Sequence, residues 1–263
     1  MENNILMIKR EEHVCTLIFN RPEKRNALSP DLLIKIYETL QDFSKDDTIR
    51  TLVFRGVGDK AFSAGYDISA IPTTPEIQQK MREVNPLQLA MDSIVNYPYP
   101  VIAMLNGFAF GAGCELAISC DIRIGADDIR MGMPPAKLGV VYAPDGFRRF
   151  IRAIGLPNTK KIFFTGRYYD AQSAKELGLV DYLVSKSELE SFTYALAKEI
   201  AENAPISLKG TKRVLNLLSR SEKMREEDQK EADAIISQAF NSEDLKEAQA
   251  AFLEKRTPTF KGK

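Results

Sequence analysis

The stretch Asn106-Gly107-Phe108-Ala109-Phe110-Gly111-Ala112-Gly113-Cys114-Glu115-Leu116 decides the fold of this chain. It follows the apolar run Val101 to Leu105, which is typical of a buried strand, and Asn106-Gly107 predicts a turn after that strand. Gly111 to Ser119 predicts a helix, so the Gly-Ala-Gly segment lies at a helix start. The first N–H groups of a helix have no partner within it, and its dipole favours negative charge there. We therefore expect a backbone site for an anion at this turn.

The N–H of Ala112 and the carboxylate of Glu115 are the candidate groups at this turn. A preorganised N–H stabilises a developing oxyanion by about 3 kcal/mol. Glu115 stands in the first helical turn and can reach the same ligand. Two other interpretations need no chemistry: the glycines allow tight packing of a helix on a strand, and Glu115 is a favourable charge at a helix N-terminus.

A second segment with small side chains, Ala61-Phe62-Ser63-Ala64-Gly65-Tyr66-Asp67, joins a predicted strand to a loop. Small residues let backbone amides approach a ligand without side chains in the way. The N–H of Tyr66 is the candidate donor here. Alone, this segment is weak evidence for a ligand site. It becomes informative when its position along the chain is considered together with that of the first segment.

The predicted elements alternate along the chain in the order strand, turn and helix, first over Thr51 to Asn96 and again over Val101 to Ser119. This alternation predicts an α/β fold. We expect residues 1–186 to form the α/β core that contains the site. Residues 187–263 are helical in pattern, and we expect them to form an appended oligomerisation region.

Composition argues against several classes of function. Lys plus Arg and Asp plus Glu both total 36, so no global charge attracts nucleic acid or an anionic membrane. The first residues match neither a secretory signal nor a transit peptide, and we expect a cytoplasmic protein. Cys15, Cys114 and Cys120 show no CxxC spacing and indicate buried, reduced thiols.

The chain contains a single histidine, His13, beside the apolar run Val14 to Phe19. This argues against a Ser-His-Asp triad, a Cys-His pair and a multi-histidine metal site. We expect neither a metal nor a separate cofactor. Any chemistry must use carboxylates, tyrosines, cations or the backbone.

Together, the two segments resemble the two halves of the crotonase (enoyl-CoA hydratase/isomerase) superfamily signature, in the same order. The resemblance runs nearly the whole length and includes Asn20 to Leu28, Cys120 to Arg123, Gly178 to Asp181 and Phe252 to Arg256. It implies a spiral of ββα units with a helical C-terminal region that forms a homotrimer or a dimer of trimers. It also implies an acyl-CoA thioester substrate, so that coenzyme A enters as part of the substrate.

The resemblance assigns roles position by position. The N–H groups of Tyr66 and Ala112 fall where the family binds the thioester oxygen. The positions that match those around coenzyme A are Lys24, Arg25, Ala27, Ala64, Asp67, Ile68, Phe252 and Lys255. Contacts like those of Phe252 and Lys255 often come from a neighbouring subunit. For Lys24 and Lys255, ordinary surface charge is an equally good interpretation.

The reaction depends on the groups opposite the oxyanion site. A two-carboxylate hydratase needs one acid and one base, and Glu115 matches the first of these. Pro135 occupies the position of the second, and proline cannot transfer a proton. The segment Met133 to Tyr142 resembles the methylmalonyl-CoA decarboxylase branch, in which loss of CO₂ generates the thioester enolate directly. Tyr142 is then a candidate to hydrogen-bond or orient the substrate carboxylate; otherwise it is a half-buried core tyrosine.

Asp145 keeps other reactions open. It lies in a loop where other family members place catalytic groups, so an enoyl-CoA hydratase or isomerase that uses Glu115 with Asp145 is the alternative. Asp145 could instead be the N-cap of a helix over Gly146 to Ala153. A non-catalytic homologue that binds CoA or RNA is a third possibility, against which the neutral charge balance and Glu115 argue.

Two departures from the decarboxylase branch concern the oxyanion site itself. That branch has a histidine where this chain has Tyr66, and a glycine usually stands where this chain has Ala112. Both substitutions keep the backbone N–H. They change the wall of the pocket and the backbone freedom rather than the donors.

Overall fold

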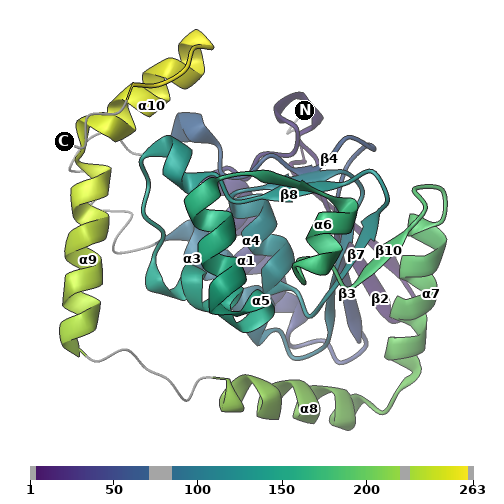
Figure 1. Ribbon diagram of the computed structural model, residues 1–263. Coiled ribbons are helices and arrows are strands. Elements are labelled where there is room, and N and C mark those ends of the chain that lie inside the picture. Colours follow the sequence, from purple (N-terminus) through teal and green to yellow (C-terminus); the bar gives the residue numbers. More distant parts are fainter. Residues whose placement is uncertain (1–3, 71–84, 220–225, 260–263) are drawn as a thin grey trace.

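The computed structural model describes residues 4–70, 85–219 and 226–259, and within these ranges two β-sheets form its centre (Figure 1). The larger sheet contains β1 (Leu6–Glu11), β2 (Val14–Phe19), β3 (Thr51–Gly56), β5 (Val101–Leu105), β7 (Ile122–Ala126) and β10 (Tyr182–Val184). They are ordered β1-β2-β3-β5-β7-β10, antiparallel between β1 and β2 and parallel elsewhere. Strands β3 and β5 are almost wholly buried, as expected for the middle of a parallel sheet covered on both faces.

The smaller sheet contains β4 (Ala61–Ser63), β6 (Phe108–Phe110), β8 (Arg130–Gly132) and β9 (Tyr168–Asp170). Its order is β4-β6-β8-β9, and only the pair β8 and β9 is antiparallel among its described strands. Each of β4, β6 and β8 follows a strand of the larger sheet along the chain. The chain therefore passes from the large sheet to the small sheet at every turn of the fold.

Helices surround the two sheets. They are α1 (Pro30–Phe43), α3 (Pro86–Asn96), α4 (Ala112–Ser119), α5 (Pro144–Thr165), α6 (Ala171–Glu176), α7 (Leu189–Glu202), α8 (Pro205–Leu218), α9 (Glu226–Phe240) and α10 (Glu243–Glu254), with the short 3-10 helices η1 (Pro22–Lys24), η2 (Ile68–Ala70) and η3 (Pro135–Leu138). The units β5-β6-α4 and β7-β8-α5 repeat the same path, and β3 and β4 precede α3 in the same way. The predicted α/β spiral of ββα units is confirmed.

Two elements, helix α3 and strand β6, differ from the sequence prediction. The helix expected within Thr51 to Asn96 is α3, which begins at Pro86, with the side chain of Asn85 capping its first N–H groups; residues 71–84 of this stretch lie outside the described residues. Strand β6 was not expected, because three residues between two glycines give no periodicity to recognise. It forms because β4 and β8 supply hydrogen-bonding partners on both sides.

Asn106 and Gly107 fix the crossing from the large sheet to the small one. The buried side chain of Asn106 accepts from the N–H of Gly56 at 3.1 Å and donates to the carbonyls of Gly56 and Gly58 at 3.0 and 2.7 Å. A Cβ atom on Gly107 would lie 2.2 Å from the carbonyl oxygen of Lys60. The turn after β5 is therefore packed directly on the turn after β3, which sets the position of β4.

The four last helices lie at the outside of the molecule (Figure 1). Helix α7 packs on the large sheet, where Thr193 and Ala197 are fully buried. Helices α8, α9 and α10 continue around the core as an arm (Figure 1). The arm returns to the core at α10, where the N atom of Leu245 would lie 3.1 Å from a Cβ on Gly139, just after η3. Among the described residues, no helix combines the length and apolarity needed to cross a bilayer.

Candidate active site

Helix α4 begins at the Gly-Ala-Gly turn, as expected. Gly111 has φ +52° and ψ −122°, a conformation that L side chains rarely adopt, and its N–H donates to the carbonyl of Gly132 at 3.0 Å. A Cβ on Gly113 would lie 2.7 Å from Cβ of Ser63. The tight-packing interpretation therefore holds for Gly113, while Gly111 is required for the turn. Ala112, between them, is the first residue of the helix and is 2% exposed.

Tyr66 is held by an isolated parallel β-bridge with Leu28. The N–H of Leu28 donates to the carbonyl of Gly65 at 2.8 Å, and the carbonyl of Leu28 accepts from the N–H of Asp67 at 3.0 Å. The bridge thus uses the groups on either side of Tyr66. It leaves the N–H of Tyr66 itself without a backbone acceptor in the described part of the chain.

The two segments meet at Gly65. Its φ is +102°, and a Cβ there would lie 2.7 Å from the carbonyl oxygen of Phe110 and 3.5 Å from the N atom of Ala112. The backbone that leads into Tyr66 therefore touches the backbone that starts α4. Two backbone N–H groups on adjoining segments, both without a described backbone acceptor, are the arrangement that an oxyanion site needs.

Glu115 lies in the first turn of α4 and is buried, with 2% of its surface exposed. Its Oε1 accepts from Nη1 of Arg149 at 2.8 Å, whereas its Oε2 has no partner among the described residues. Burial raises the pKa of Glu115, and the charge and hydrogen bond of Arg149, with a smaller contribution from Tyr142, oppose that rise. Because the Glu115 carboxylate is buried, it is not simply a solvated charge at a helix N-terminus.

Tyr142 is half-buried beside Glu115, and its ring packs on Phe163 with the ring centroids 5.4 Å apart. Burial, followed by the nearby Glu115 carboxylate, raises the pKa of Tyr142 well above its ordinary value. The phenol therefore stays neutral at physiological pH and can donate a hydrogen bond. Gly146 makes this contact possible, since a Cβ there would lie 2.8 Å from Cδ1 of Tyr142 and 3.2 Å from Oε1 of Glu115.

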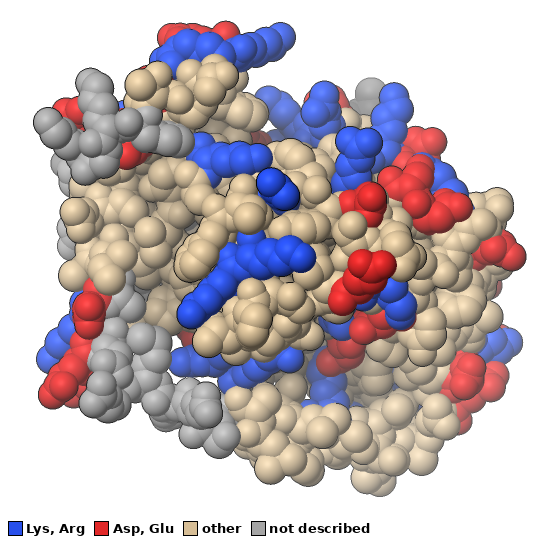
Figure 2. Space-filling model, in the orientation of Figure 1, with Lys and Arg blue, Asp and Glu red and all other residues tan. Residues whose placement is uncertain are grey.

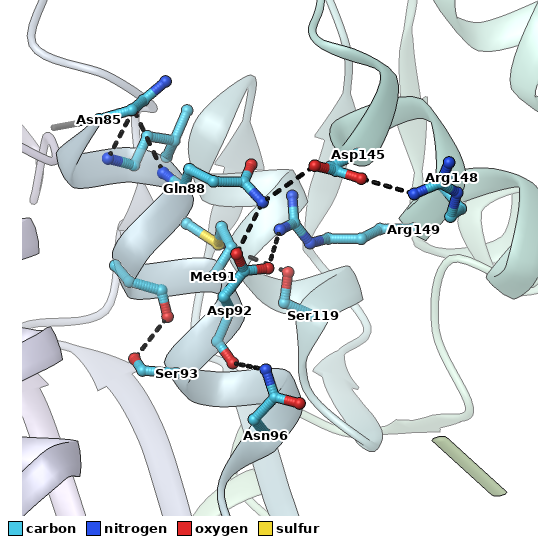
Figure 3. A network of polar contacts seen from close by, with 12 residues as sticks. Asn85, Gln88, Met91, Asp92, Ser93, Asn96, Ser119, Asp145, Arg148 and Arg149 are labelled. Atoms are coloured by element: carbon cyan, nitrogen blue, oxygen red, sulfur yellow. Dashed lines mark hydrogen bonds and ion pairs between the residues drawn. The ribbon is translucent and has the colours of Figure 1, made fainter. Parts of the chain in front are cut away.

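Asp145 lies in the first turn of α5, and the N-cap of that helix is Ala143. The expectation that Asp145 is the N-cap is therefore wrong: Pro144 fixes the first helical φ, so the helix begins one residue before Asp145. The Asp145 carboxylate accepts from Arg148 at 2.6 Å and from Gln88 at 3.5 Å, and its side chain is 52% exposed (Figure 3).

Pro135 is the first residue of η3 and is buried. It brings no ionisable group to the position where the family resemblance expects the second carboxylate. Among the described residues, no three His, Cys, Asp or Glu side chains lie close enough together to hold a metal ion.

Sequence reasoning missed Arg149 and its second partner, Asp92. Nη2 of Arg149 donates to Oδ1 of Asp92 at 2.7 Å, and Figure 3 shows Arg149 reaching from α5 to α3 to make this contact. The sequence does contain a signal, because Arg149 falls next to Phe150 on the apolar side of the α5 pattern. A buried arginine requires an anionic partner, and Glu115 was already a candidate.

The positions expected near the nucleotide come together at the start of the chain and after β4. The N–H of Ala64 donates to the carbonyl of Arg25 at 3.0 Å, and Asp67 forms an ion pair with Arg21 at 2.9 Å. Lys24 ends η1, Ala27 accepts from Arg21 at 2.7 Å, and Ile68 begins η2. Sequence reasoning did not identify Arg21 as a residue that holds these two segments together.

Phe252 and Lys255 lie at the end of α10. Phe252 is 57% exposed, and Lys255 is the C-cap of the helix with φ +56°. These two residues thus belong to the arm, which returns to its own core next to η3.

Although the net charge of the chain is zero, basic and acidic side chains are unevenly distributed over its surface. Figure 2 shows Lys and Arg side chains gathered over the middle of one face, with most Asp and Glu side chains nearer its margin. Exposed basic residues on and just after α5 are Arg152, Lys160, Lys161 and Arg167. Such a surface raises the local concentration of anionic solutes even when the whole chain is neutral.

Comparison with known proteins agrees with this geometry. The profile of the enoyl-CoA hydratase/isomerase family matches residues 9–263, and the chain belongs to this family. It is therefore a crotonase-fold acyl-CoA enzyme.

Individual relatives include hydratases and a decarboxylase. The chain is 34% identical to the short-chain-enoyl-CoA hydratase of Clostridium acetobutylicum, over 97% of each protein. It is similar to the crystal structure of methylmalonyl-CoA decarboxylase complexed with 2S-carboxypropyl-CoA, with a TM-score of 0.93 and 31% identity over 100% of both chains. The enoyl-CoA hydratase from Bacillus anthracis gives a TM-score of 0.78 at 30% identity, covering 99% of this chain and 100% of that one.

Proposed function

We propose that this enzyme decarboxylates a short malonyl-type acyl-CoA thioester such as methylmalonyl-CoA. The observation that carries the proposal is the side chain opposite Glu115 in the family pattern: Pro135, buried at the start of η3, has no proton to give or take. Addition of water across a double bond by the two-carboxylate route needs an acid and a base. Decarboxylation needs no base, because breaking the carbon–carbon bond itself leaves the electron pair.

In the proposed reaction, the thioester oxygen accepts hydrogen bonds from the N–H groups of Tyr66 and Ala112. The bond between the α-carbon and the carboxylate breaks, CO₂ leaves, and the electron pair forms the enolate, whose charge develops on the thioester oxygen. Preorganised N–H groups stabilise that charge more than the neutral carbonyl of the ground state. The α-carbon then takes up one proton, which comes in net terms from solvent.

Tyr142 supplies the hydrogen bond that orients the departing carboxylate in this proposal. Its raised pKa makes it a neutral donor and a poor proton source, so binding and orientation suit it better than acid catalysis. Orientation matters because the breaking bond must align with the π system of the thioester carbonyl. The likeness to the methylmalonyl-CoA decarboxylase structure supports decarboxylation as the reaction.

Coenzyme A, as part of the substrate, is proposed to lie along Lys24, Arg25, Ala27, Ala64, Asp67 and Ile68. The hydrogen bond between Ala64 and Arg25 and the ion pair between Arg21 and Asp67 hold these two segments together. Phe252 and Lys255 are proposed to contact CoA from α10. No additional cofactor enters the proposed reaction.

Hydration or isomerisation of an enoyl-CoA is the second candidate. It is favoured by the identity with the Clostridium acetobutylicum hydratase and by Oε2 of Glu115, a buried carboxylate oxygen that could accept a proton. The weakness of this candidate lies in Asp145, whose carboxylate is half exposed and already bonded to Arg148.

The deciding experiment compares three substrates with one enzyme preparation: methylmalonyl-CoA, crotonyl-CoA and a 3-enoyl-CoA. We expect CO₂ release from methylmalonyl-CoA well above the uncatalysed rate. CO₂ release at the background rate, together with hydration of crotonyl-CoA that is lost in Glu115→Gln, would replace decarboxylation by hydration.

We also propose that the arm is covered by other copies of the chain, as a homotrimer or a dimer of trimers. Large apolar side chains on α8 are exposed, including Ile206 at 84% and Leu218 at 67%. Apolar surface of this extent is typical of association sites. Light scattering behind gel filtration tests the proposal; a monomeric mass at micromolar concentration contradicts it.

A further inference from the structure

Arg149 joins two carboxylates from different helices. Its Nη1 donates to Oε1 of Glu115 at 2.8 Å and its Nη2 donates to Oδ1 of Asp92 at 2.7 Å. The side chains of Arg149 and Glu115 are 7% and 3% exposed, whereas that of Asp92 is 51% exposed. One guanidinium thus connects a buried carboxylate on α4 with a carboxylate at the surface of α3.

The two contacts fix the orientation of the guanidinium. Because its nitrogens lie in one rigid plane, it cannot rotate away from Glu115 without also breaking the contact with Asp92. Asp92 is itself held in place, because Gln88 donates to its Oδ2 at 2.8 Å (Figure 3). Oε1 of Glu115 is therefore held in place, and Oε2 is the oxygen left for another partner.

A buried carboxylate oxygen without a partner is costly and uncommon in folded proteins. Oε2 of Glu115 is such an atom within the described residues. It lies on the first turn of α4, whose first N–H belongs to Ala112. A substrate atom bound next to that N–H is the natural partner for Oε2.

The charge of Glu115 depends on few groups. Those that act on it are Asp92 on α3, Arg149 on α5 and Tyr142 before α5, and Cys114 on α4 is its neighbour. Burial raises the pKa of Cys114 to about 12 and raises that of Tyr142 well above its ordinary value, so both are neutral at physiological pH. Asp145 and Arg148 are one step further away, connected through Gln88. Arg149 is the one cation among these described groups that contacts the carboxylate.

We infer that Arg149 is a positioning residue that stabilises the charged form of Glu115 and directs Oε2 toward the substrate. The inference rests on the proposed acyl-CoA site and deepens it. Its consequence is that the protonation state of Glu115 depends on one contact: burial favours the neutral carboxyl, and the guanidinium of Arg149 favours the carboxylate.

The test measures the titration of Glu115 directly, by carbon NMR of the full-length protein labelled at the side-chain carboxyl of glutamate. The Glu115 signal is identified by its loss in Glu115→Gln. In Arg149→Met we expect its titration midpoint to move upward by about 1 to 3 pH units, because an adjacent opposite charge lowers a carboxyl pKa by that amount. In Arg149→Lys, which keeps the charge, the midpoint should stay near the wild-type value.

Two further variants separate positioning from stability. Lys212→Met removes another buried cation, one that pairs with Asp121 at 2.6 Å away from this site, and should leave the Glu115 midpoint unchanged. Arg149→Gln keeps the size and a hydrogen bond without the charge, so it replaces Arg149→Met if that variant does not fold. It should show the same upward shift.

Turnover gives the second readout. The pH dependence of kcat/KM should move with the Glu115 midpoint in Arg149→Met and recover in Arg149→Lys. An unchanged midpoint in both neutral variants overturns the inference, and so does a shifted midpoint with an unmoved pH profile. Failure of the proposed decarboxylation appears separately, as background CO₂ release by the wild-type enzyme.

Discussion

Leu28 pairs with Tyr66 in a single parallel β-bridge that uses the carbonyl before Tyr66 and the N–H after it. The bridge therefore fixes the position of the N–H of Tyr66 but does not use this N–H in a backbone hydrogen bond. A short bridge of this kind explains how a loop residue becomes a fixed donor: the flanking groups are bonded, and the middle one is not.

Gly65→Ala should disable the proposed oxyanion site. The new Cβ would meet the carbonyl oxygen of Phe110 at 2.7 Å, at a backbone φ of +102°. We expect kcat to fall about 100-fold, because the donors near Tyr66 and Ala112 lose their alignment. Steady-state kinetics measures this. Gly58→Ala is the matched control, since its φ is +76° and its Cβ would meet nothing within 4 Å; an equal loss of kcat there would contradict the interpretation.

Gly146→Ala should separate Tyr142 from Glu115. Its Cβ would lie within 3.2 Å of both side chains, closer than ordinary contacts allow. We expect a fall of kcat by about ten-fold or more with little change of KM, since a displacement of this size affects alignment rather than binding. The control is Gly210→Ala on exposed α8, where nothing lies within 4 Å and the helix should gain about 1 kcal/mol of stability. A kcat of Gly146→Ala equal to that of wild type would show that the contact between Tyr142 and Glu115 does not contribute to the reaction.

Tyr142→Phe should lower kcat for CO₂ release by about ten-fold to a thousand-fold, within the range for one lost transition-state hydrogen bond. The wild-type rate should also persist through the ordinary titration range of tyrosine, because burial raises the pKa of Tyr142 above it. Rates measured between pH 8 and pH 10 (about the unperturbed value) check both statements. A kcat in Tyr142→Phe equal to that of wild type would leave Tyr142 a core tyrosine only.

Lys212→Met should destabilise the protein without changing its activity. Lys212 is buried, pairs with Asp121 at 2.6 Å and donates to the carbonyl of Tyr99 at 3.0 Å, which attaches α8 to the core. Removing Lys212 takes the cation from a carboxylate that is one-third exposed, at a cost of about 1 to 2 kcal/mol, less than for a fully buried pair. Urea unfolding measures the loss; a midpoint equal to that of wild type would show that α8 is held by other contacts.

Stability should fall as the pH rises above 9, the ordinary pKa of a cysteine thiol. Burial raises the pKa of Cys15 to about 11 and that of Cys114 to about 12. The unfolded chain therefore ionises first, so these groups favour the folded state fully below pH 9 and progressively less up to pH 12. Urea unfolding at pH 8 and pH 10.5 (about midway through the window) should show the decrease. Cys15→Ser with Cys114→Ser should reduce the decrease without abolishing it, because burial also raises the pKa of Cys120.

The order of the elements was predictable because it depends on local patterns. The buried apolar run Val101 to Leu105 predicted strand β5, and the glycines predicted the start of α4. These features depend on a few neighbouring residues, so they can be recognised in one dimension. The short strand β6 could not, because its partners β4 and β8 come from other turns of the spiral.

By itself, the sequence determined the family, predicted two backbone donors at Tyr66 and Ala112, and put a proline at position 135, where a second carboxylate was expected. Only the tertiary structure decided which groups surround Glu115. Arg149 comes from α5 and Asp92 from α3, and no local pattern connects them. The physical reason is that desolvation and Coulomb interactions depend on distances in space, so the charge of a buried carboxylate is set by residues far apart in the chain.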